Sequence, residues 1–450
     1  MSVFTAFKKK FTLTLISSGI ICTDLIGLPE FVSGAMENWG LVTYKETYVL
    51  YSPSESSTVD MRQIASVISH ELSHSWFGNL VTISWWNDLW LNEGMANYLE
   101  YKGQNAVNAS WNILRRFVIG DLHPAFRSDV GQSAHPVVND ALTSDEITSI
   151  FDTITYSKGA SIAYMIESMI GENRFRDACI SYLNNYQFRN VKTDDFIRHL
   201  SPAIQEVTQL SGEQYLYSYL YRNTFPILTV KRGSSSSSSN TLIINQTPYN
   251  EVSDSESRGK DNKEDSLYWN IFVTYLLGNN GESAGQEHGN FMLKDNGQQQ
   301  TVTLSRQIQS DEWFKLNVNS TGYYIVNYQP EDWQLLIKQL SSIASTSTST
   351  SSFTPQDRAS LLFDAYQLSN KALVSYDTLF ALFDYLQYED EYLPWSAANS
   401  ALSGIQSKLQ AVESNSIERW NTYITTLVGD VFDAKVDLVS GSDDKLLEQM

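Results

Sequence analysis

Residues 64–100 read IASVISHELSHSWFGNLVTISWWNDLWLNEGMANYLE, and this stretch decides the fold expected around it. It holds the pattern His-Glu-x-x-His at His70, Glu71 and His74, with eighteen residues between His74 and Glu93. Apolar residues before His70 recur at helical spacing, which predicts a helix. Residues four positions apart lie on one face of a helix, so both histidine side chains can reach one metal ion.

These residue types favour a tetrahedral zinc ion. Two imidazoles and one carboxylate are zinc ligands, and three protein ligands leave a fourth position open for water. We therefore expect one zinc per chain, bound by His70, His74 and Glu93, with Glu93 on a second helix that folds back on the first. Glu71 is next to the first ligand and is expected to act as the general base. A pair of packed helical histidines is the alternative, but chance yields on the order of 0.01 such patterns in a chain of this composition.

Two further carboxylates lie close to the pattern. Glu100 comes seven positions after Glu93 and therefore lies on nearly the same helix face. A carboxylate there can hydrogen-bond a ligand histidine, and Asp88 is a second candidate for that role. A solvated or purely structural role is the alternative for both residues, and the sequence favours it.

A second motif lies upstream, at Gly34, Ala35, Met36, Glu37 and Asn38. Turn residues alternate with β-formers in this region, so the motif is expected to form or adjoin an edge strand, to which a peptide can add as a further strand. The motif resembles the exopeptidase signature of the gluzincin zinc aminopeptidases, the family of aminopeptidase N and the puromycin-sensitive aminopeptidases. This resemblance implies that the five residues bind substrate and that Glu37 binds its free α-amine.

A third motif lies downstream, where residues 151–159 read FDTITYSKG. It resembles the segment of the same family that carries its catalytic tyrosine, here Tyr156. The resemblance implies that the Tyr156 hydroxyl stabilises the oxyanion of the tetrahedral intermediate. Sequence pattern alone does not distinguish Tyr156 among the 25 tyrosines. The order and separation of the three motifs fit the family, and the resemblance runs from about Asp24 to beyond residue 360.

A chain of 450 residues, of which 42% are hydrophobic, is long enough for two to four domains. Helical spacing dominates residues 56–222 and strand-like runs follow Pro226, so we expect an α+β multidomain fold. The resemblance implies a thermolysin-like, mostly helical catalytic domain with N-terminal strands, then a small β-sandwich, then the start of an α-helical array. The expected boundaries are 1–22 for an apolar N-terminus outside the family-like sequence, 23–222 for the catalytic domain, 223–330 for the β-sandwich, 331–354 for a polar linker and 355–450 for a partial helical domain.

Both ends of the chain differ from the family pattern. The family has a large β domain before the catalytic domain and a longer helical domain after it, so the resemblance implies a chain truncated at both ends. Residues 1–22 contain three lysines followed by a mostly apolar run. This segment fits a mistaken start of the chain or a signal peptide, and the first interpretation is favoured.

Charge and cysteine content limit the partners and the compartment. A net charge of −20 argues against nucleic-acid binding. Cys22 and Cys179 allow at most one disulfide, which favours a cytoplasmic location. A membrane-anchored or secreted protein is the alternative if the complete chain carries a signal, although the chain as given is not expected to bind a membrane.

The three motifs together predict a zinc metallo-aminopeptidase that hydrolyses the N-terminal peptide bond of peptides with a free N-terminus, through a zinc-activated water. Capture of the amine and zinc binding place only the first peptide bond at the nucleophile. Alternatives among enzymes are an endopeptidase on a thermolysin-like core, against which Glu37 argues, and the epoxide hydrolases of the family, which share the zinc residues. A catalytically silent fragment that acts as a peptide-binding scaffold is the alternative outside enzymes.

Overall fold

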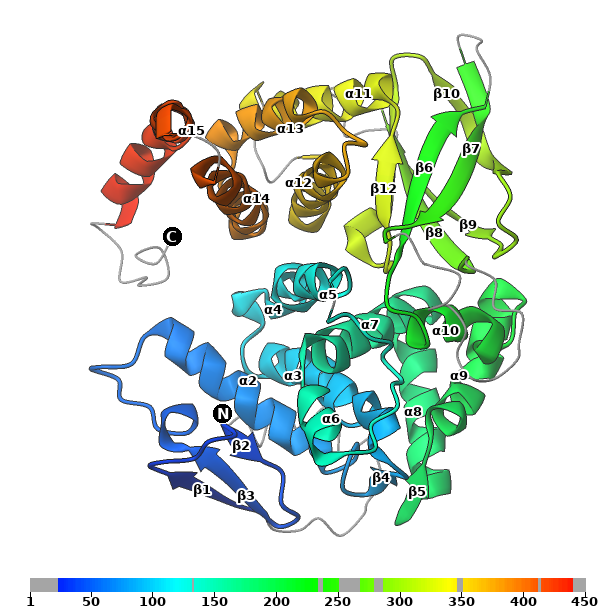
Figure 1. The fold of residues 1–450 in the computed structure, drawn as a ribbon, viewed down its shortest axis with the longest axis vertical. Coiled ribbons are helices and arrows are strands. Elements are labelled where there is room, and N and C mark those ends of the chain that lie inside the picture. The colour runs from blue at the N-terminus through cyan, green and yellow to red at the C-terminus, as the bar shows by residue number, and fades with distance from the viewer. Residues whose placement is uncertain are drawn as a thin grey trace. The chain divides into compact units, whose positions relative to one another are not determined.

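The computed structural model describes residues 23–131, 133–233, 238–250, 268–278, 286–345, 351–411 and 414–439. These residues form two compact units, divided along the chain between Thr224 and Phe225 (Figure 1). The segment 1–22, which the sequence set apart, lies outside the described residues. Within the described ranges, every helix is too short or too polar to span a membrane.

The N-terminal unit begins with a three-stranded sheet of order β1-β3-β2. Strand β1 (Asp24–Leu28) runs parallel to β3 (Leu41–Lys45), and β2 (Ala35–Met36) pairs antiparallel with β3. Strand β2, which carries part of the second motif, is therefore an edge of this sheet.

Helices make up most of the remainder of this unit (Figure 1). Their bounds are α2 Thr58–His74, α3 Glu93–Val107, α4 Ile113–Phe117, α5 His123–Ser128, α6 Ser144–Ser149, α7 Gly159–Ile170, α8 Glu172–Tyr186, α9 Thr193–Thr208 and α10 Gly212–Leu220. Two π-helical turns, Val118–Leu122 and Ile154–Lys158, directly precede α5 and α7. Strands β4 (Val81–Ile83) and β5 (Arg189–Val191) form a small parallel pair.

Two local features fix helices α2 and α3. Ser57 accepts a hydrogen bond from the Asp60 amide and the Asp60 carboxylate accepts one from the Ser57 amide, a capping box that starts α2. Helix α3 packs against α2 and is buried along most of its length. At the start of α3, a Cβ added to Gly94 would lie 3.0 Å from the Gly159 backbone. This close approach brings the start of α7 against the start of α3.

The C-terminal unit contains a four-stranded sheet of order β10-β7-β6-β12 and a three-stranded sheet of order β11-β8-β9. The strand bounds are β6 Pro226–Arg232, β7 Ser238–Pro248, β8 Ile271–Gly278, β9 Glu287–Leu293, β10 Gln300–Gln309, β11 Trp313–Leu316 and β12 Ile325–Tyr328. The helices that follow are α11 Pro330–Ser341, α12 Pro355–Asn370, α13 Tyr376–Phe383, α14 Tyr392–Gln410 and α15 Ser414–Val439. The mixed class of helices with small sheets, expected from the sequence, is confirmed.

The structure corrects the polar linker expected at residues 331–354. Helix α11 occupies Pro330–Ser341, and a 3₁₀ turn continues to Ser345. A proline at the first helical position loses no intrahelical hydrogen bond, because that amide has no partner in a helix. Trp333, Leu336 and Leu340 are buried at helical spacing. The linker prediction was wrong over α11. It treated the helical spacing of these apolar residues as part of the serine-rich sequence that follows the helix.

Candidate metal centre

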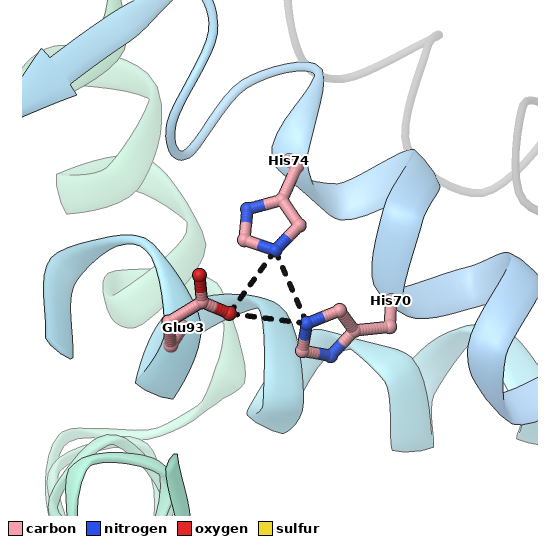
Figure 2. A group of neighbouring side chains, drawn as sticks. All are labelled: His70, His74 and Glu93. Atoms are coloured by element: carbon pink, nitrogen blue, oxygen red, sulfur yellow. Dashed lines mark hydrogen bonds and ion pairs between the residues drawn. The ribbon is translucent and has the colours of Figure 1, made fainter. Parts of the chain in front are cut away.

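Helix α2 ends at His74 and carries His70 one turn earlier, whereas α3 begins at Glu93. The three side chains point toward one another from these two helices (Figure 2). His70 Nε2 lies 3.1 Å from His74 Nε2 and 3.4 Å from Glu93 Oε2, and His74 Nε2 lies 3.3 Å from Glu93 Oε2. The packing of α2 on α3 therefore brings together the three residues that the sequence assigned to a metal.

The separations of these three atoms fit a tetrahedral ion. Zinc binds imidazole nitrogen and carboxylate oxygen at about 2.0–2.2 Å, so two ligands of a tetrahedral site lie about 3.4 Å apart. The measured separations of 3.1, 3.3 and 3.4 Å are close to that value. In the part of the chain that the structure describes, this is the one group of three or more His, Cys, Asp or Glu side chains close enough to share a metal.

Charge is concentrated out of water at this centre. Burial lowers the pKa of His70, but hydrogen bonds to Glu100 and Glu93 outweigh burial and hold that pKa well above 6.5. Burial raises the pKa of Glu93, but the two histidines outweigh it and hold that pKa well below 4.5. An ionised carboxylate thus faces two nitrogens that take up positive charge. A divalent cation can supply that charge in place of the histidine protons.

Each histidine is oriented through its second ring nitrogen. His74 Nδ1 donates to Phe77 O at 2.9 Å, so its Nε2 faces the centre. His70 Nδ1 donates to Glu100 Oε2 at 3.1 Å, and Ser66 Oγ donates to Glu100 Oε1 at 2.7 Å. Such partners fix the tautomer of a ligand histidine and raise its basicity. The sequence favoured a solvated or structural role for Glu100, whereas its carboxylate in fact contacts His70.

Asp88, the other carboxylate that the sequence considered, has a different role. It accepts a hydrogen bond from Thr193 N at 2.9 Å, at the first residue of α9. The Asp88 carboxylate therefore stabilises the start of a helix. Ser66, which does support the centre, was missed because nothing marks a serine 34 positions before its partner Glu100.

Glu71 lies on α2 between the two histidines and is 6% exposed. Its Oε2 atom has no hydrogen-bond partner among the described residues. Burial raises the pKa of Glu71 to about 7, although the two neighbouring histidines act to lower it. A buried carboxylate with a free oxygen and a pKa near neutrality is suited to accept and release a proton.

The second motif forms the edge strand of the N-terminal sheet. Gly34 has a φ of 82°, and a Cβ added there would lie 3.2 Å from the Tyr48 ring, so the turn into β2 requires glycine. Ala35 and Met36 form β2 itself. A hydrogen bond from Asn38 Nδ2 to Thr43 Oγ1, 3.3 Å long, closes the turn that follows.

Glu37 is the member of this motif that approaches a histidine of the centre. Asn79 Nδ2 donates to Glu37 O at 2.8 Å and so attaches the motif to the loop after α2. The Glu37 side chain reaches back, with Oε1 3.9 Å from His74 Nδ1. The fold thus brings a carboxylate from an edge strand beside one of the clustered histidines.

Tyr156 approaches from a third element, the π-helical turn Ile154–Lys158. Such turns are rare and occur frequently at functional sites. The Tyr156 ring stacks on the His70 ring, with centroids 6.0 Å apart and planes inclined by 15°. Burial, followed by the charge of Glu93 and a hydrogen bond to it, raises the pKa of Tyr156 far above 10. The hydroxyl therefore remains protonated and can donate.

Two histidines lie one turn apart on one helix, a glutamate comes from the next helix, and a carboxylate lies between the histidines. This arrangement is typical of metallopeptidases of the His-Glu-x-x-His class. Residues 2–215 match the Peptidase family M1 domain, and residues 313–450 match the ERAP1-like C-terminal domain. The chain belongs to peptidase family M1. The first match starts at residue 2 and so includes residues 2–22, which were expected to lie outside the family-like sequence.

Curated relatives of this chain are named as aminopeptidases. Aminopeptidase A of Gloydius brevicauda is 36% identical over 382 residues, which are 85% of this chain and 37% of the relative. Glutamyl aminopeptidase of Homo sapiens is 35% identical over 411 residues, 91% of this chain and 40% of the relative. Aminopeptidase N of Mus musculus is 35% identical over 388 residues, 85% of this chain and 38% of the relative. The chain therefore spans less than half the length of these relatives.

Proposed function

We propose that the protein is a zinc aminopeptidase that removes the N-terminal residue of peptides. The observation that carries this proposal is the set of three ligand atoms 3.1–3.4 Å apart, with the Glu37 carboxylate beside the His74 ring. The aminopeptidase names of the relatives support it. His70, His74 and Glu93 hold one zinc per chain. When bound, zinc supplies Lewis-acid polarisation of the scissile carbonyl and of a water molecule.

Glu71 and Tyr156 carry out the proton transfer and the oxyanion stabilisation. The free Glu71 Oε2 accepts a proton from the attacking water and later delivers it to the leaving amine. The Tyr156 hydroxyl stays neutral and donates a hydrogen bond to the oxygen that becomes negative in the transition state. Both roles require only side chains that already surround the three ligand atoms.

Glu37 makes the enzyme an exopeptidase. A substrate ammonium group loses its hydration on entering the site, and a carboxylate offsets that loss through charge-assisted hydrogen bonds. Residues Gly34, Ala35, Met36 and Asn38 hold Glu37 on the sheet edge, where the substrate backbone pairs with β2 as an added strand. With its amine fixed there, a peptide presents only its first peptide bond.

The domain order that we propose is a thermolysin-like catalytic domain at 23–222, a β-sandwich at 223–330 and a helical domain after residue 355. The two family matches and the two sheets of the C-terminal unit support this order. Peptides with a free N-terminus are the partners. A net charge of −20 makes nucleic acid an unfavourable partner.

Matched peptides with free and acetylated N-termini test the proposal. Acetylation removes the ammonium charge and adds bulk, so the free-amine peptide should be cleaved far faster, by a protein that holds about one zinc per chain. Glu37→Ala should slow the free-amine peptide by about 10- to 100-fold with unchanged zinc content, the loss expected for a hydrogen bond to a charged group. Glu55→Ala, at an exposed position, is the control.

Two results would overturn the proposal. Equal rates on the free and acetylated peptides would favour an endopeptidase. A protein with neither zinc nor hydrolysis would favour a binding role.

A further inference from the structure

Asp121, in the π-helical turn Val118–Leu122, accepts three hydrogen bonds in the interior. Its carboxylate Oδ1 accepts from Asn97 Nδ2 at 2.8 Å and from Ser157 Oγ at 2.7 Å, and its Oδ2 accepts from the Tyr101 hydroxyl at 2.5 Å. The residue is 6% exposed. A buried carboxylate held by three neutral donors is costly to desolvate, so its partners are held firmly in return.

The three donors come from two elements of the candidate centre. Asn97 and Tyr101 lie on α3, one and two turns after Glu93, and face the same side. Ser157 directly follows Tyr156 in the turn before α7. One carboxylate therefore links the helix that begins with Glu93 to the turn that carries Tyr156.

The turn has other attachments, and one of them, the hydrogen bond of Tyr156 to Glu93, also reaches α3. Asp152 Oδ1 accepts from the amides of Ile154 and Thr155 at 2.9 and 3.1 Å, and holds the start of the turn. Lys158 is paired with Asp129, after α5, at 2.8 Å. The hydrogen bond from Ser157 to Asp121, which Asn97 and Tyr101 join to α3, is thus a second side-chain link between the turn and α3, beside the contact of Tyr156 with Glu93.

We infer that Asp121 is a positioning residue that acts through Ser157 to set the place of the Tyr156 hydroxyl relative to Glu93. This inference rests on the proposed function, in which Tyr156 donates to the oxyanion. A misplacement of about 1 Å at a catalytic group costs on the order of 10²-fold in rate. A π-helical turn is a rare element that occurs frequently at functional sites, and the link from Ser157 to Asp121 starts inside this turn.

Two substitutions, each of which removes one hydrogen bond to Asp121, test this role. Ser157→Ala removes the hydrogen bond between Asp121 and the turn that carries Tyr156. Tyr101→Phe removes a hydrogen bond between Asp121 and α3, and it serves as the matched control. In the full chain, Ser157→Ala should lower kcat for a free-amine peptide by about 10- to 100-fold, with KM within about threefold and zinc content unchanged. Tyr101→Phe should leave kcat within about threefold of the wild type.

A double substitution separates positioning from general loss of structure. In a Tyr156→Phe background, Ser157→Ala should change kcat by less than about twofold, because the hydroxyl that it positions is already gone. An equal fractional loss in both backgrounds would overturn the inference. Loss of zinc in Ser157→Ala would also overturn it.

Hydrogen exchange distinguishes a failure of this inference from a failure of the proposed function. A wild-type protein that does not cleave peptides contradicts the proposed function, and exchange at the amides of residues 154–158 then tests the link directly. Ser157→Ala should speed that exchange at least about tenfold relative to Tyr101→Phe. Equal exchange in the two variants would show that Ser157 does not hold the turn.

Discussion

Buried carboxylates have different partners in the two units of the chain. In the C-terminal unit, four of them pair with lysine or arginine: Glu312 with Arg306 at 2.7 Å, Asp332 with Arg232 at 2.8 Å, Asp357 with Lys315 at 2.8 Å and Glu389 with Arg358 at 2.6 Å. In the N-terminal unit, Asp129 pairs with Lys158 in the same way. Glu93 instead lies beside two histidines, and Asp121 accepts hydrogen bonds from neutral donors. Glu71 has an oxygen, Oε2, without a hydrogen-bond partner among the described residues.

The difference separates structural carboxylates from functional ones. A buried charge is tolerated when the fold supplies its counter-charge. The C-terminal unit supplies counter-charges to these four carboxylates from its own side chains, so the four have no capacity left for a ligand. The carboxylates around His70 and His74 retain that capacity. They are therefore the group that could hold a cation, and carboxylates with perturbed pKa values are common at functional sites.

The largest effect on the rate of peptide cleavage is expected at Glu71, whose Oε2 atom has no hydrogen-bond partner among the described residues. Glu71→Gln keeps the shape of the side chain but cannot accept a proton, so the rate should fall by at least the ~10²–10⁴ typical of a general base. Zinc content should stay near one per chain, because Glu71 is not a ligand. Steady-state kinetics and metal analysis measure the two quantities on the same sample.

His74→Ala is the counterpart of that change and should lose both zinc and activity. If Glu71→Gln also lost zinc, Glu71 would be a ligand or a support of one. Glu71 would then not differ in role from His70, His74 and Glu93.

A smaller effect, on stability alone, is expected at the buried ion pair of Arg358 and Glu389 in the C-terminal unit. Arg358 is fully buried and donates two hydrogen bonds to Glu389. Glu389→Gln leaves the guanidinium charge uncompensated and should lower the free energy of unfolding by about 3–5 kcal/mol, measured by urea denaturation. Zinc content should not change.

Replacement of both partners tests that explanation. Arg358→Met combined with Glu389→Leu removes both charges and should recover most of the lost stability. A double variant as unstable as Glu389→Gln would show that packing, rather than the unpaired charge, dominates.

Asp364 sharpens the comparison, because it is a buried carboxylate of the C-terminal unit without a lysine or arginine in ion-pair contact among the described residues. Burial raises its pKa to about 7, although the Val326 amide and the charge of Lys315 act to lower it. Between its usual pKa of 3.8 and 7, the folded protein keeps a proton that the unfolded chain has released. The stability from this proton is complete below about pH 4 and is lost as the pH rises through 7.

Asp364→Asn removes this titration and keeps an oxygen for the Val326 amide. Its free energy of unfolding should match that of the wild type near pH 4 and exceed it by about 2–4 kcal/mol near pH 8. Urea denaturation across that pH range measures the difference. A constant difference at all pH values would mean that Asp364 ionises normally.

The sequence predicted the parts of the site that local geometry controls. The positions of His70 and His74 follow from the helix period, and that of Glu93 follows from its place in the next helical run. Tyr156 required a family resemblance, because its environment is made by distant segments. Ser157 and Asp121 carried no signal, since they are 36 positions apart and meet only after folding.

Outside the site, too, the sequence predicted features that depend on neighbouring residues better than features that depend on distant segments. Helix α2 was visible in its apolar period, and it starts with a capping box of Ser57 and Asp60, which lie three positions apart. Helix α11 was missed, because its apolar period was read together with the serine-rich stretch after it. Local capping and periodicity are properties of a few neighbouring residues, whereas the pairing of strands and of buried charges depends on segments far apart in the chain.

The smallest effect is expected at Glu100, which contacts His70 through Nδ1 and lies outside the three-atom cluster. Glu100→Gln can still accept from His70 with its amide oxygen, so the ring should keep its orientation. The lost negative charge lowers the basicity of the imidazole, and zinc affinity should fall by about 10- to 100-fold, measured by competition with a chelator. Ser66→Ala leaves the Glu100 charge in place and removes one hydrogen bond, so it should weaken zinc by less than about tenfold. If the two variants weaken zinc equally, the orientation of Glu100 matters more than its charge, and if neither does, its contact with His70 plays no part in metal binding.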